Sequence, residues 1–495
     1  MTNVTPLTPL WAPPGGAFWA GTWRDTGLTH EVRNPGSGDV VGHVADCGPD
    51  DVDHAVRAVA DAVLAGPAWP LWQRREALRR AAEIVGERAD LLATVISSEG
   101  TKTIREARRE VTRATEVLRL CAEQADRLEG HTVPFDNTPR GVGRFGWYTR
   151  EPVGVVAAVT PFNDPLNLVA HKLGPALIGG NGVVLKPAEA TPLSALALLE
   201  ALLDAGVPGG RLAVTPGRGA NIGSVLLAHP LIDMVSFTGG AETGDRIART
   251  AGAKKTLMEL GGVGTVIVLA DSNPAAAAEA VVGGAFGNAG QNCLSVQRVF
   301  VARDLMADMT RRVEAGASAL VVGAQHDEAT DVGPMIDLKN AQRVKEWIDD
   351  AVAAGATCVT GGRREGTYVH PTVLTSVPRG ARLLVEEVFG PVVCLEAFDE
   401  LDDVVAEVNS LEFGLQSGVF SEDLSKALDL ADRLRVGAVM INDTGDFRID
   451  AMPFGGSKRS GVGREGVPFA VEAMTEPKLV AIKRRPEPRA PACGT

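Results

Sequence analysis

The feature that most constrains the fold is an alternation of short apolar runs with helical stretches, which begins at Glu151. The runs are rich in β-branched residues and are bounded by Gly and Pro, a pattern typical of buried strands. Strands that alternate with helices form parallel sheets with right-handed crossovers, so we predict an α/β protein with a doubly wound sheet. The first series of runs is VGVVAAVT, GNGVVLKP, GGRLAVTPG, DMVSFTGG and GVGTVIVLAD.

A second series predicts a second domain of the same kind. It consists of VQRVFVA, TCVTGG, VVCLEAF, QSGVFS and AVMINDT, separated by helical stretches. Because 495 residues exceed what one hydrophobic core organises, we expect this second doubly wound domain to begin soon after Gly262. Before the first series, residues 50–130 carry apolar side chains at three- and four-residue steps, which indicates amphipathic helices.

Charge and cysteine usage exclude several classes of protein. A formal net charge of −13 disfavours a phosphate backbone or an anionic membrane as partner. The six cysteines are scattered without a CxxC pair, so neither a metal site nor a disulfide framework is expected. The N-terminal stretch resembles no secretory signal, and no apolar run of about 18 residues is present, so we expect a soluble cytoplasmic protein.

Three fragments carry residues suited to chemistry on a carbonyl group. GAFGNAGQNC presents Cys293 after a Gly-rich approach, where a thiol could act as a nucleophile if the site favours its thiolate. MELGG places Glu259 in an apolar setting that raises a carboxyl pKa and suits a general base. TPFNDP holds Asn163 in a stiff turn, from which its amide can donate to an oxyanion. Taken singly, each also suits a structural role, as buried Cys, strand Glu or turn Asn.

Seven motifs in order carry a resemblance over essentially the whole chain: TPFNDP, KPAEATP, SFTGG, MELGG, GQNC, EEVFGPV and PFGGSKRSG. This order resembles the aldehyde dehydrogenase superfamily. The resemblance implies that Cys293 is the nucleophile, Glu259 the base that activates the deacylating water, and Asn163 the oxyanion donor. It also implies that Lys172 and Glu476, in HKLGP and TEPK, take part in a proton relay.

The same resemblance implies two Rossmann-type domains with a small β arm for oligomerisation, and hence a homodimer or homotetramer. We expect an NAD-binding domain at 1–130 and 151–260, a catalytic domain at 261–445, an arm at 131–150 and 475–490, a return segment lining the site at 446–474 and a frayed tail at 491–495.

The cofactor implied by the resemblance is NAD rather than NADP. The pattern GRGANIG is a weak dinucleotide fingerprint, because its last Gly comes one residue late. Glu189 suits NAD because its carboxylate accepts from a ribose hydroxyl and repels a 2′-phosphate. Gly240 stands where relatives usually have Ser, so backbone donors at the helix start have to hold the pyrophosphate. The implied cofactor contacts are Thr160, Lys186, Glu189, Gly239, Gly240, Glu387 and Phe389.

The expected product is the free acid. Members that release acyl-CoA typically lack the base that this chain has in Glu259. Val263 and Thr265 depart from the residues usual after the base, polar and Pro respectively, which could alter that loop.

We expect a small aldehyde with an anionic tail, such as a phosphonate- or phosphate-bearing aldehyde, lactaldehyde or a semialdehyde. Positions that are apolar in members acting on fatty aldehydes are polar here, and unpaired polar groups would reject an apolar chain. The alternative is that Arg113 is a solvated helix residue and that Arg448 pairs with Asp446 or Asp450. The predicted substrate contacts are Arg113, Asn167, His171, Asn292 and Arg448, with Asp164 beside them.

Two other functions remain open at this point. A thiol esterase or hydrolase could use Cys293 without nicotinamide, but it would need a His or Lys beside the thiol, and none lies near it in sequence. A catalytically silent binding protein of the same fold would have no reason to keep Cys293, Glu259 and Asn163 together.

Overall fold

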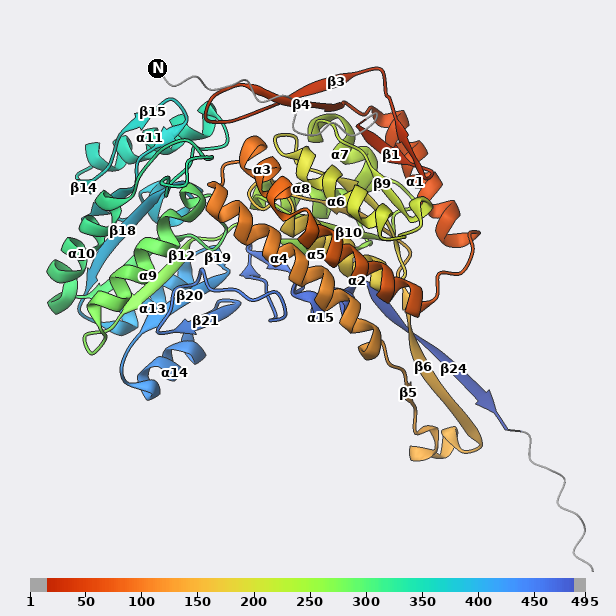
Figure 1. Ribbon diagram of the computed structural model, residues 1–495. Helices are drawn as coiled ribbons and strands as arrows, with labels where there is room; N and C mark the ends of the chain where they lie inside the picture. The colour runs from red at the N-terminus through yellow and green to blue at the C-terminus, as the bar shows by residue number, and fades with distance from the viewer. Residues whose placement is uncertain (1–15, 485–495) are drawn as a thin grey trace, which may run out of the picture.

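The computed structural model describes residues 16–484 and shows two α/β bodies side by side, with a β arm projecting from the first (Figure 1). The prediction of two doubly wound domains and an arm is confirmed. The first body is built on an eight-stranded sheet whose order is β2-β1-β9-β8-β7-β10-β11-β23. Its strands are β1 (Ala17–Trp19), β2 (Thr22–Arg24), β7 (Val155–Val159), β8 (Gly182–Lys186), β9 (Leu212–Val214), β10 (Met234–Thr238), β11 (Lys255–Glu259) and β23 (Gly461–Val462).

Both faces of this sheet are covered by helices, which explains why its strands read as continuous apolar runs. In β7, Val156 and Ala158 point into the core on one face, and Val155 and Ala157 point into the core on the other. The helices of the first body are α1 (Pro49–Leu64), α2 (Leu71–Glu87), α3 (Ala89–Glu99), α4 (Ile104–Glu123), α5 (Asn167–Gly179), α6 (Pro192–Asp204), α7 (Gly219–Ala228), α8 (Ala241–Ala251) and α15 (Val467–Ala473).

The second body repeats the plan on a seven-stranded sheet of order β14-β17-β18-β13-β12-β20-β21. These strands are β12 (Gly264–Val268), β13 (Val296–Ala302), β14 (Thr357–Thr360), β17 (Thr372–Thr375), β18 (Val392–Phe398), β20 (Gln416–Phe420) and β21 (Ala438–Ile441). Its helices are α9 (Pro274–Phe286), α10 (Met306–Ala319), α11 (Leu338–Ala353), α12 (Arg382–Val385), α13 (Leu401–Ser410) and α14 (Leu424–Arg433). Two small sheets have two strands each. In one, β15 (Arg364–Glu365) pairs with β16 (Tyr368–Val369), and in the other, β19 (Phe413–Gly414) pairs with β22 (Ser457–Lys458).

Some pairings were not predictable from the run pattern. β14 is antiparallel to β17 at the edge of the second sheet, whereas the sequence predicted parallel strands throughout. β23 comes from the end of the chain and pairs antiparallel with β11 in the first sheet. Edge strands of two to four residues have no periodicity of their own, so only tertiary contacts specify them.

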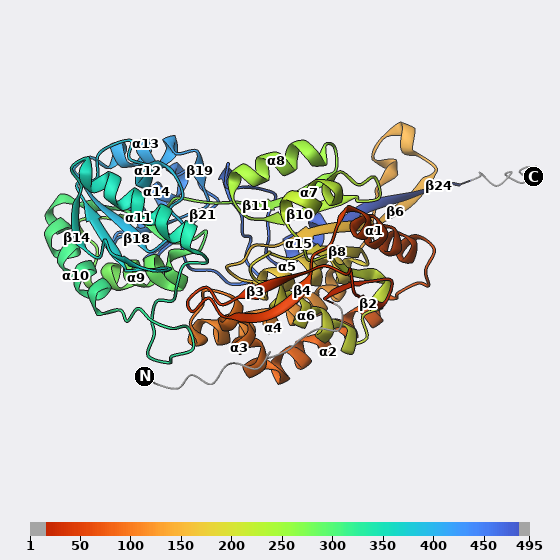
Figure 2. The same ribbon diagram turned by 90° about the horizontal axis from the view of Figure 1, so that it is seen from above.

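A hairpin near the start of the chain connects the two bodies. β3 (Thr29–Arg33) and β4 (Val40–Ala45) cross the first body, as Figures 1 and 2 show, and their turn reaches the second. There the Thr367 hydroxyl donates to the carbonyl of Pro35 at 2.8 Å. The hairpin helps to fix how the two bodies face each other.

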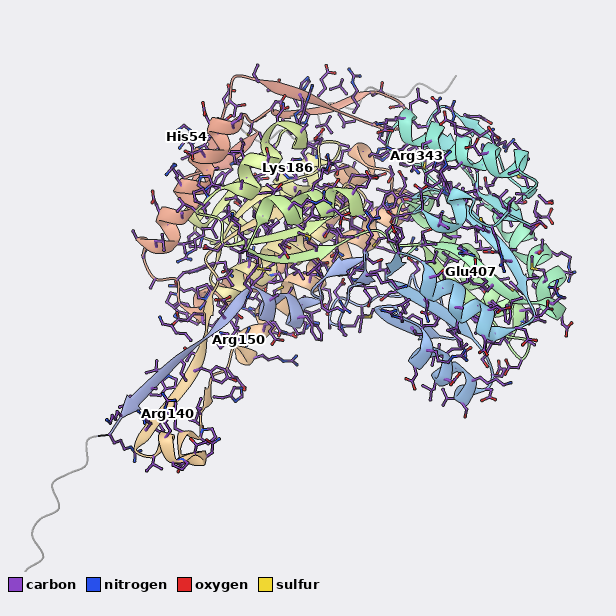
Figure 3. The ribbon with its side chains drawn as sticks, turned by 180° about the vertical axis from the view of Figure 1, so that it is seen from behind. His54, Arg140, Arg150, Lys186, Arg343 and Glu407 are labelled. Atoms are coloured by element: carbon purple, nitrogen blue, oxygen red, sulfur yellow. The ribbon has the colours of Figure 1, made fainter. Side chains whose placement is uncertain are left out.

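The arm is a three-stranded antiparallel sheet of order β24-β6-β5. β24 (Thr475–Lys483) pairs along its whole length with β6 (Arg144–Pro152), and β5 (His131–Thr132) adds two residues. Figure 3 shows Arg150 near the body and Arg140 near the tip of the arm. The predicted tail at 491–495 lies outside the described residues. No helix within residues 16–484 is long and apolar enough to cross a membrane.

Candidate active site

A cavity of about 830 Å³ lies between the two bodies. It is lined by the turn after β7, the end of β11, the start of α8, one face of α4 and the loops around Cys293 and Arg448. Twelve of the residues predicted for the site line this one cavity: Arg113, Thr160, Asn163, Asn167, Gly239, Gly240, Glu259, Asn292, Cys293, Glu387, Phe389 and Arg448.

Cys293 lies in the loop that leads from the end of α9 to the start of β13, and its side chain is partly exposed to the cavity. Asn288 and Ala289 adopt left-handed backbone conformations with φ of 50° and 54°, which turns the chain sharply towards the thiol. The thiol donates to Oδ1 of Asn292 at 3.7 Å, a long contact. Burial raises the pKa of Cys293, neighbouring carboxylates raise it further, and Arg448 opposes them. These surroundings disfavour the thiolate that a nucleophile needs, so attack by Cys293 requires a proton acceptor in the cavity.

Asn288 links the nucleophile loop to the predicted oxyanion turn, a role that the sequence reasoning missed. Its Nδ2 donates to the carbonyls of Asn163 and Gln291, both at 3.3 Å. Its Oδ1 accepts from the Thr101 hydroxyl at 2.7 Å. An Asn before a small residue and a Gly could have suggested a left-handed turn, but not these partners.

Glu259 ends β11 with its side chain buried, and neither carboxylate oxygen has a hydrogen-bond partner within residues 16–484. Burial first, and then the charge of Glu465, raises the pKa of Glu259 well above its usual range. Gly455, with φ of 155°, leaves room for the carboxyl: a Cβ there would lie 2.7 Å from Oε1 of Glu259. An unpaired carboxyl with a raised pKa has the properties of a general base.

Lys172 is fully buried in α5 and pairs with a carboxylate that the sequence reasoning missed. Its Nζ donates to Oε1 of Glu465 at 3.0 Å and to the Thr238 hydroxyl at 2.8 Å. The cations Lys172 and Arg448 hold the pKa of Glu465 at about 2, despite its burial. The motif GREG contains Glu465, but nothing in the sequence marks it as the partner of Lys172.

The structure does not bring Glu476 to the site. Its side chain is exposed at the start of β24, where it pairs with Nζ of Lys255 at 3.2 Å. The assignment of Glu476 to a proton relay is therefore corrected, because the arm strand carries this carboxylate away from Lys172. The carboxylate beside Lys172 is Glu465.

The predicted substrate residues form a charged cluster at one end of the cavity. The Arg113 guanidinium donates to Oδ1 of Asp450 at 2.7 Å, and Nε2 of His171 lies 2.9 Å from the same oxygen. Arg448 stacks on the Phe454 ring at 3.7 Å and lies 3.5 Å from Glu465. The alternative that Arg448 pairs with Asp446 or Asp450 is wrong, because the ion pair of Arg448 is with Glu465, and Asp450 is bonded to Arg113.

Part of the polar capacity of this cluster is unused. Nε of Arg448 and both side-chain polar atoms of Asn167 are buried without a partner within residues 16–484. Burial lowers the pKa of His171, which disfavours the imidazolium form that would attract an anion. Asn292 donates from Nδ2 to Oδ1 of Asp446 at 2.7 Å. A polar ligand would satisfy groups that an apolar one would leave unpaired.

The other end of the cavity fits a dinucleotide. Gly239 and Gly240 precede α8, whose unpaired N–H groups attract anions. A Cβ on Gly240 would meet nothing within 4 Å, so the structure has room for the Ser that relatives usually have at this position. Nζ of the buried Lys186 donates only to the carbonyl of Pro187 within residues 16–484, and Oε1 of Glu189 accepts from the Gly219 N–H. Lys186, Glu189 and His171 are near but do not line the cavity itself.

Glu387 and Phe389 lie between this end and Cys293. Oε1 of Glu387 accepts from the Gly262 N–H at 3.1 Å, and burial raises its pKa to about 7. Gly261 lets this carboxylate approach the backbone, because a Cβ there would lie 2.3 Å from Oε2 and would displace the Glu387 side chain. Phe389 meets Phe162 edge to face at 5.8 Å.

The two departures after Glu259 are accommodated within the core. Val263 is buried, and the Thr265 hydroxyl lies 2.6 Å from that of Ser417 across β12 and β20. Both residues therefore pack in the second body, and the loop still presents Glu259 to the cavity.

Comparison with known proteins identifies the family. The profile described as "Aldehyde dehydrogenase family" matches residues 23–480. Aspartate-semialdehyde dehydrogenase 1 of Pseudomonas canavaninivorans is 46% identical over 91% of this chain and 96% of its own, and 3-sulfolactaldehyde dehydrogenase of Priestia aryabhattai is 42% identical over 94% and 98%. The crystal structure of NADP-dependent glyceraldehyde-3-phosphate dehydrogenase from Bacillus halodurans, complexed with NADP, superposes with a TM-score of 0.93 at 35% identity, covering 96% of this chain and all of that one. With a family match over nearly its whole length and relatives above 40% identity, this chain belongs to the aldehyde dehydrogenase family.

Proposed function

We propose that this enzyme oxidises a small anionic aldehyde to its carboxylic acid with NAD, through a thioester on Cys293. The observation that carries the proposal is the single cavity lined by Cys293, Glu259 and Asn163, by Arg448, and by Gly239 and Gly240 at the start of α8. A nicotinamide cofactor, when bound, supplies the acceptor for the hydride. The remaining chemistry belongs to side chains of this chain.

Acylation begins when Sγ of Cys293 attacks the aldehyde carbon and its proton passes to an acceptor in the cavity. Because the pKa of the thiol is raised, the attack needs that acceptor, and Glu259 is the buried carboxyl without a partner. The Asn163 amide donates to the oxyanion that forms on the carbonyl oxygen. Loss of hydride from the same carbon then leaves the thioester.

Deacylation uses Glu259 as a general base. A water attacks the thioester carbon, Glu259 takes its proton, and the Cys293 sulfur leaves as the acid forms. After each of the two proton transfers, the proton on Glu259 leaves through the neighbouring Glu465 carboxylate, which pairs with Lys172 at 3.0 Å, so Glu259 is ionised again before it acts as the base. The overall change is aldehyde, NAD⁺ and water to acid, NADH and a proton.

NAD is proposed over NADP because Glu189 stands beside the expected ribose. Its carboxylate is held by the Gly219 N–H and would repel a 2′-phosphate. Relatives include enzymes that use NADP, such as the Bacillus halodurans enzyme, so the preference rests on Glu189 alone.

The anionic tail is proposed because the Arg448 side chain lines the cavity and its buried Nε has no hydrogen-bond partner within residues 16–484. A guanidinium binds carboxylates, phosphates and sulfonates through paired donors. The names of the two curated relatives denote aldehydes with an acidic group, which supports the same substrate class. An esterase without nicotinamide is not favoured, since Asn292, rather than a His or Lys, contacts the Cys293 thiol.

The same proposal includes a cytoplasmic homodimer or homotetramer joined through the arm. The arm exposes apolar side chains on a projecting sheet with free edges, a surface suited to pairing with another subunit. The predicted domain limits at residues 130, 260 and 445 belong to this proposal too.

The test compares reduction of NAD and of NADP by wild type and Cys293→Ala, with anionic and neutral aldehydes of equal length. Wild type should favour NAD and the anionic aldehyde, and Cys293→Ala should form no NADH, because no other group can hold the acyl chain. Mass spectrometry of wild type quenched in turnover should detect an acyl adduct on Cys293. Turnover by Cys293→Ala, or a preference for neutral aldehydes, contradicts the proposal.

A further inference from the structure

The two groups that would act on the aldehyde carbonyl come from different bodies of the enzyme. Cys293 precedes β13 in the second body, and Asn163 follows β7 in the first. The proposed acylation step needs the thiol at the carbonyl carbon and the amide at the carbonyl oxygen at the same time, and a misplacement of about 1 Å can cost about 10²-fold in rate. Contacts between the bodies therefore have to set the distance between Cys293 and Asn163.

The loop before Cys293 has a backbone shape that it would not keep by itself. Asn288, Ala289 and Gly290 have φ of 50°, 54° and 66°, a left-handed conformation that is unfavourable for Ala. A Cβ at Gly290 would lie 2.2 Å from the carbonyl oxygen of Gly390, so the loop also passes directly against the backbone of the second body. Such a conformation persists only where the surrounding contacts enforce it.

Two of these contacts come from the start of α4, in the first body. The Thr101 hydroxyl donates to Oδ1 of Asn288 at 2.7 Å, and Oε1 of Glu106 accepts from the Asn288 N–H at 2.7 Å. Oε2 of Glu106 accepts from the N–H and the hydroxyl of Thr103 at 2.9 and 3.0 Å, so a capping box holds this carboxylate in place. The first body thereby fixes both the backbone and the side chain of a residue in the second.

The remaining bonds of Asn288 give its amide one orientation. Nδ2 donates to the carbonyls of Asn163 and Gln291, both at 3.3 Å. Because a carbonyl can only accept, exchanging the amide nitrogen and oxygen would place Oδ1 against two acceptors. Gln291 is in turn fixed to the second body, where its side chain bonds the Pro334 carbonyl at 3.1 Å and the Ile336 N–H at 2.9 Å. Asn288 thus joins the backbone of the oxyanion residue to the loop that carries the thiol.

We propose that Thr101 and Glu106 are positioning residues for the nucleophile. They hold Asn288, and Asn288 sets the Cys293 thiol at the distance from Asn163 that acylation needs. This inference rests on the proposed function, in which the thiol attacks the carbonyl whose oxygen the Asn163 amide binds. It adds no chemical step, because Thr101 and Glu106 act through Asn288 and not on the reacting atoms.

The first measurement is the single-turnover rate of NADH formation from 4-oxobutanoate and NAD. Thr101→Val removes the hydroxyl and keeps the shape of the side chain, and its rate should fall by about 10- to 100-fold because the thiol is misaligned. The KM for NAD should stay within about threefold of that of wild type. Glu106→Ala should lose as much rate, and Glu106→Gln should return to within about threefold of wild type, because its side-chain carbonyl still accepts from the Asn288 N–H.

A second measurement separates positioning from a general loosening of the site. Alkylation of Cys293 by iodoacetamide needs the thiol but no oxyanion donor, because no charge develops on a carbonyl oxygen. Its rate, followed by mass spectrometry of the Cys293 peptide, should stay within about threefold of wild type in Thr101→Val. In an Asn163→Ala background, Thr101→Val should slow acylation by less than about threefold, because no oxyanion donor is left to misalign.

Thr115→Val and Glu116→Ala are the matched controls on the same helix. Thr115 donates to the Val111 carbonyl, Glu116 pairs with Arg119, and neither residue lines the cavity. Both controls should keep the wild-type rates of acylation and alkylation.

Three results would overturn the inference and leave the proposed function standing. They are acylation by Thr101→Val or Glu106→Ala at the rate of the controls, a loss of alkylation as large as the loss of acylation, and losses from Thr101→Val and Asn163→Ala that multiply. Thr101→Val decides the question if Glu106→Ala, which also loses the helix cap, does not fold. A loss below about threefold in Asn163→Ala alone, or no NADH from wild type with 4-oxobutanoate and other anionic aldehydes, instead contradicts the proposed function.

Discussion

At the scale of single residues, the pKa values of two neighbouring buried carboxyls are shifted in opposite directions. Lys172 and Arg448 lower the pKa of Glu465 to about 2, whereas Glu259 has no hydrogen-bond partner within residues 16–484 and its pKa is raised. The difference arises from the placement of cations and not from burial, because both side chains are buried. A raised pKa makes the ionised Glu259 a stronger proton acceptor, and a neighbouring carboxylate paired with a lysine can receive the proton that Glu259 releases.

The stability of Glu259→Gln relative to wild type should increase as the pH rises. The folded pKa lies above the unfolded value, so the contribution of Glu259 to stability is present below the unfolded pKa and is lost as pH rises through the folded pKa. Gln stays neutral throughout. The Tm of Glu259→Gln minus that of wild type should therefore increase from pH 5 to pH 9, while its steady turnover falls by about 10²- to 10⁴-fold.

Glu422→Gln serves as the control because Glu422 is an exposed carboxyl. Its Tm difference from wild type should not change with pH. If the Tm difference between Glu259→Gln and wild type does not change with pH, as expected for the control, Glu259 has the same pKa in the folded protein as in the unfolded chain.

At the scale of elements, α4 holds the start of α5, which carries three of the predicted site residues. Leu166 precedes α5 and offers no side-chain cap. Instead Oε1 of Glu110 accepts from the N–H groups of Leu166 and Asn167 at 2.8 and 3.0 Å, and Oε2 accepts from Lys102 at 2.7 Å. A negative charge at a helix start is favourable, and here it comes from a different helix.

Glu110→Gln should lower the free energy of unfolding by about 2 kcal/mol, because charged hydrogen bonds become neutral ones in a buried site. The matched control is Glu116→Gln on the outer face of α4, where a partly exposed pair with Arg119 is lost and the change should stay below about 1 kcal/mol. Chemical denaturation of both variants measures the difference. Equal losses for the two would show that the α4 carboxylate does not stabilise the start of α5.

At the scale of the whole molecule, the arm is the surface that we propose joins two subunits. It projects from the first body in both views of Figures 1 and 2, and a small sheet with two solvated faces is marginally stable alone. β24 exposes Leu479, Val480 and Ile482, at 55%, 39% and 47% of their surfaces. These side chains alternate between the two faces of the strand, so both faces are available for contact with a second subunit.

Ile482→Glu should therefore shift the protein towards monomer, since burying a carboxylate in an apolar contact is costly. Light scattering coupled to size-exclusion chromatography at several concentrations measures the mass. Leu64→Glu is the control, because Leu64 is 80% exposed at the end of α1 and lies outside the arm. An unchanged mass for Ile482→Glu would exclude this part of the arm from the interface.

The sequence alone determined the fold class with its two α/β bodies, and its motifs singled out three residues that line one cavity, Cys293, Glu259 and Asn163. Buried parallel strands must be apolar on both faces, so β7 and its neighbours are legible as continuous runs. Cys293, Glu259 and Asn163 stand in local motifs whose shape is set within a few residues. Tertiary structure decided how distant side chains pair: it placed Glu465 and not Glu476 beside Lys172, and it paired Asp450 with Arg113. These outcomes depend on how α4, α5 and the segment after β21 converge, and no local pattern encodes a contact between segments hundreds of residues apart.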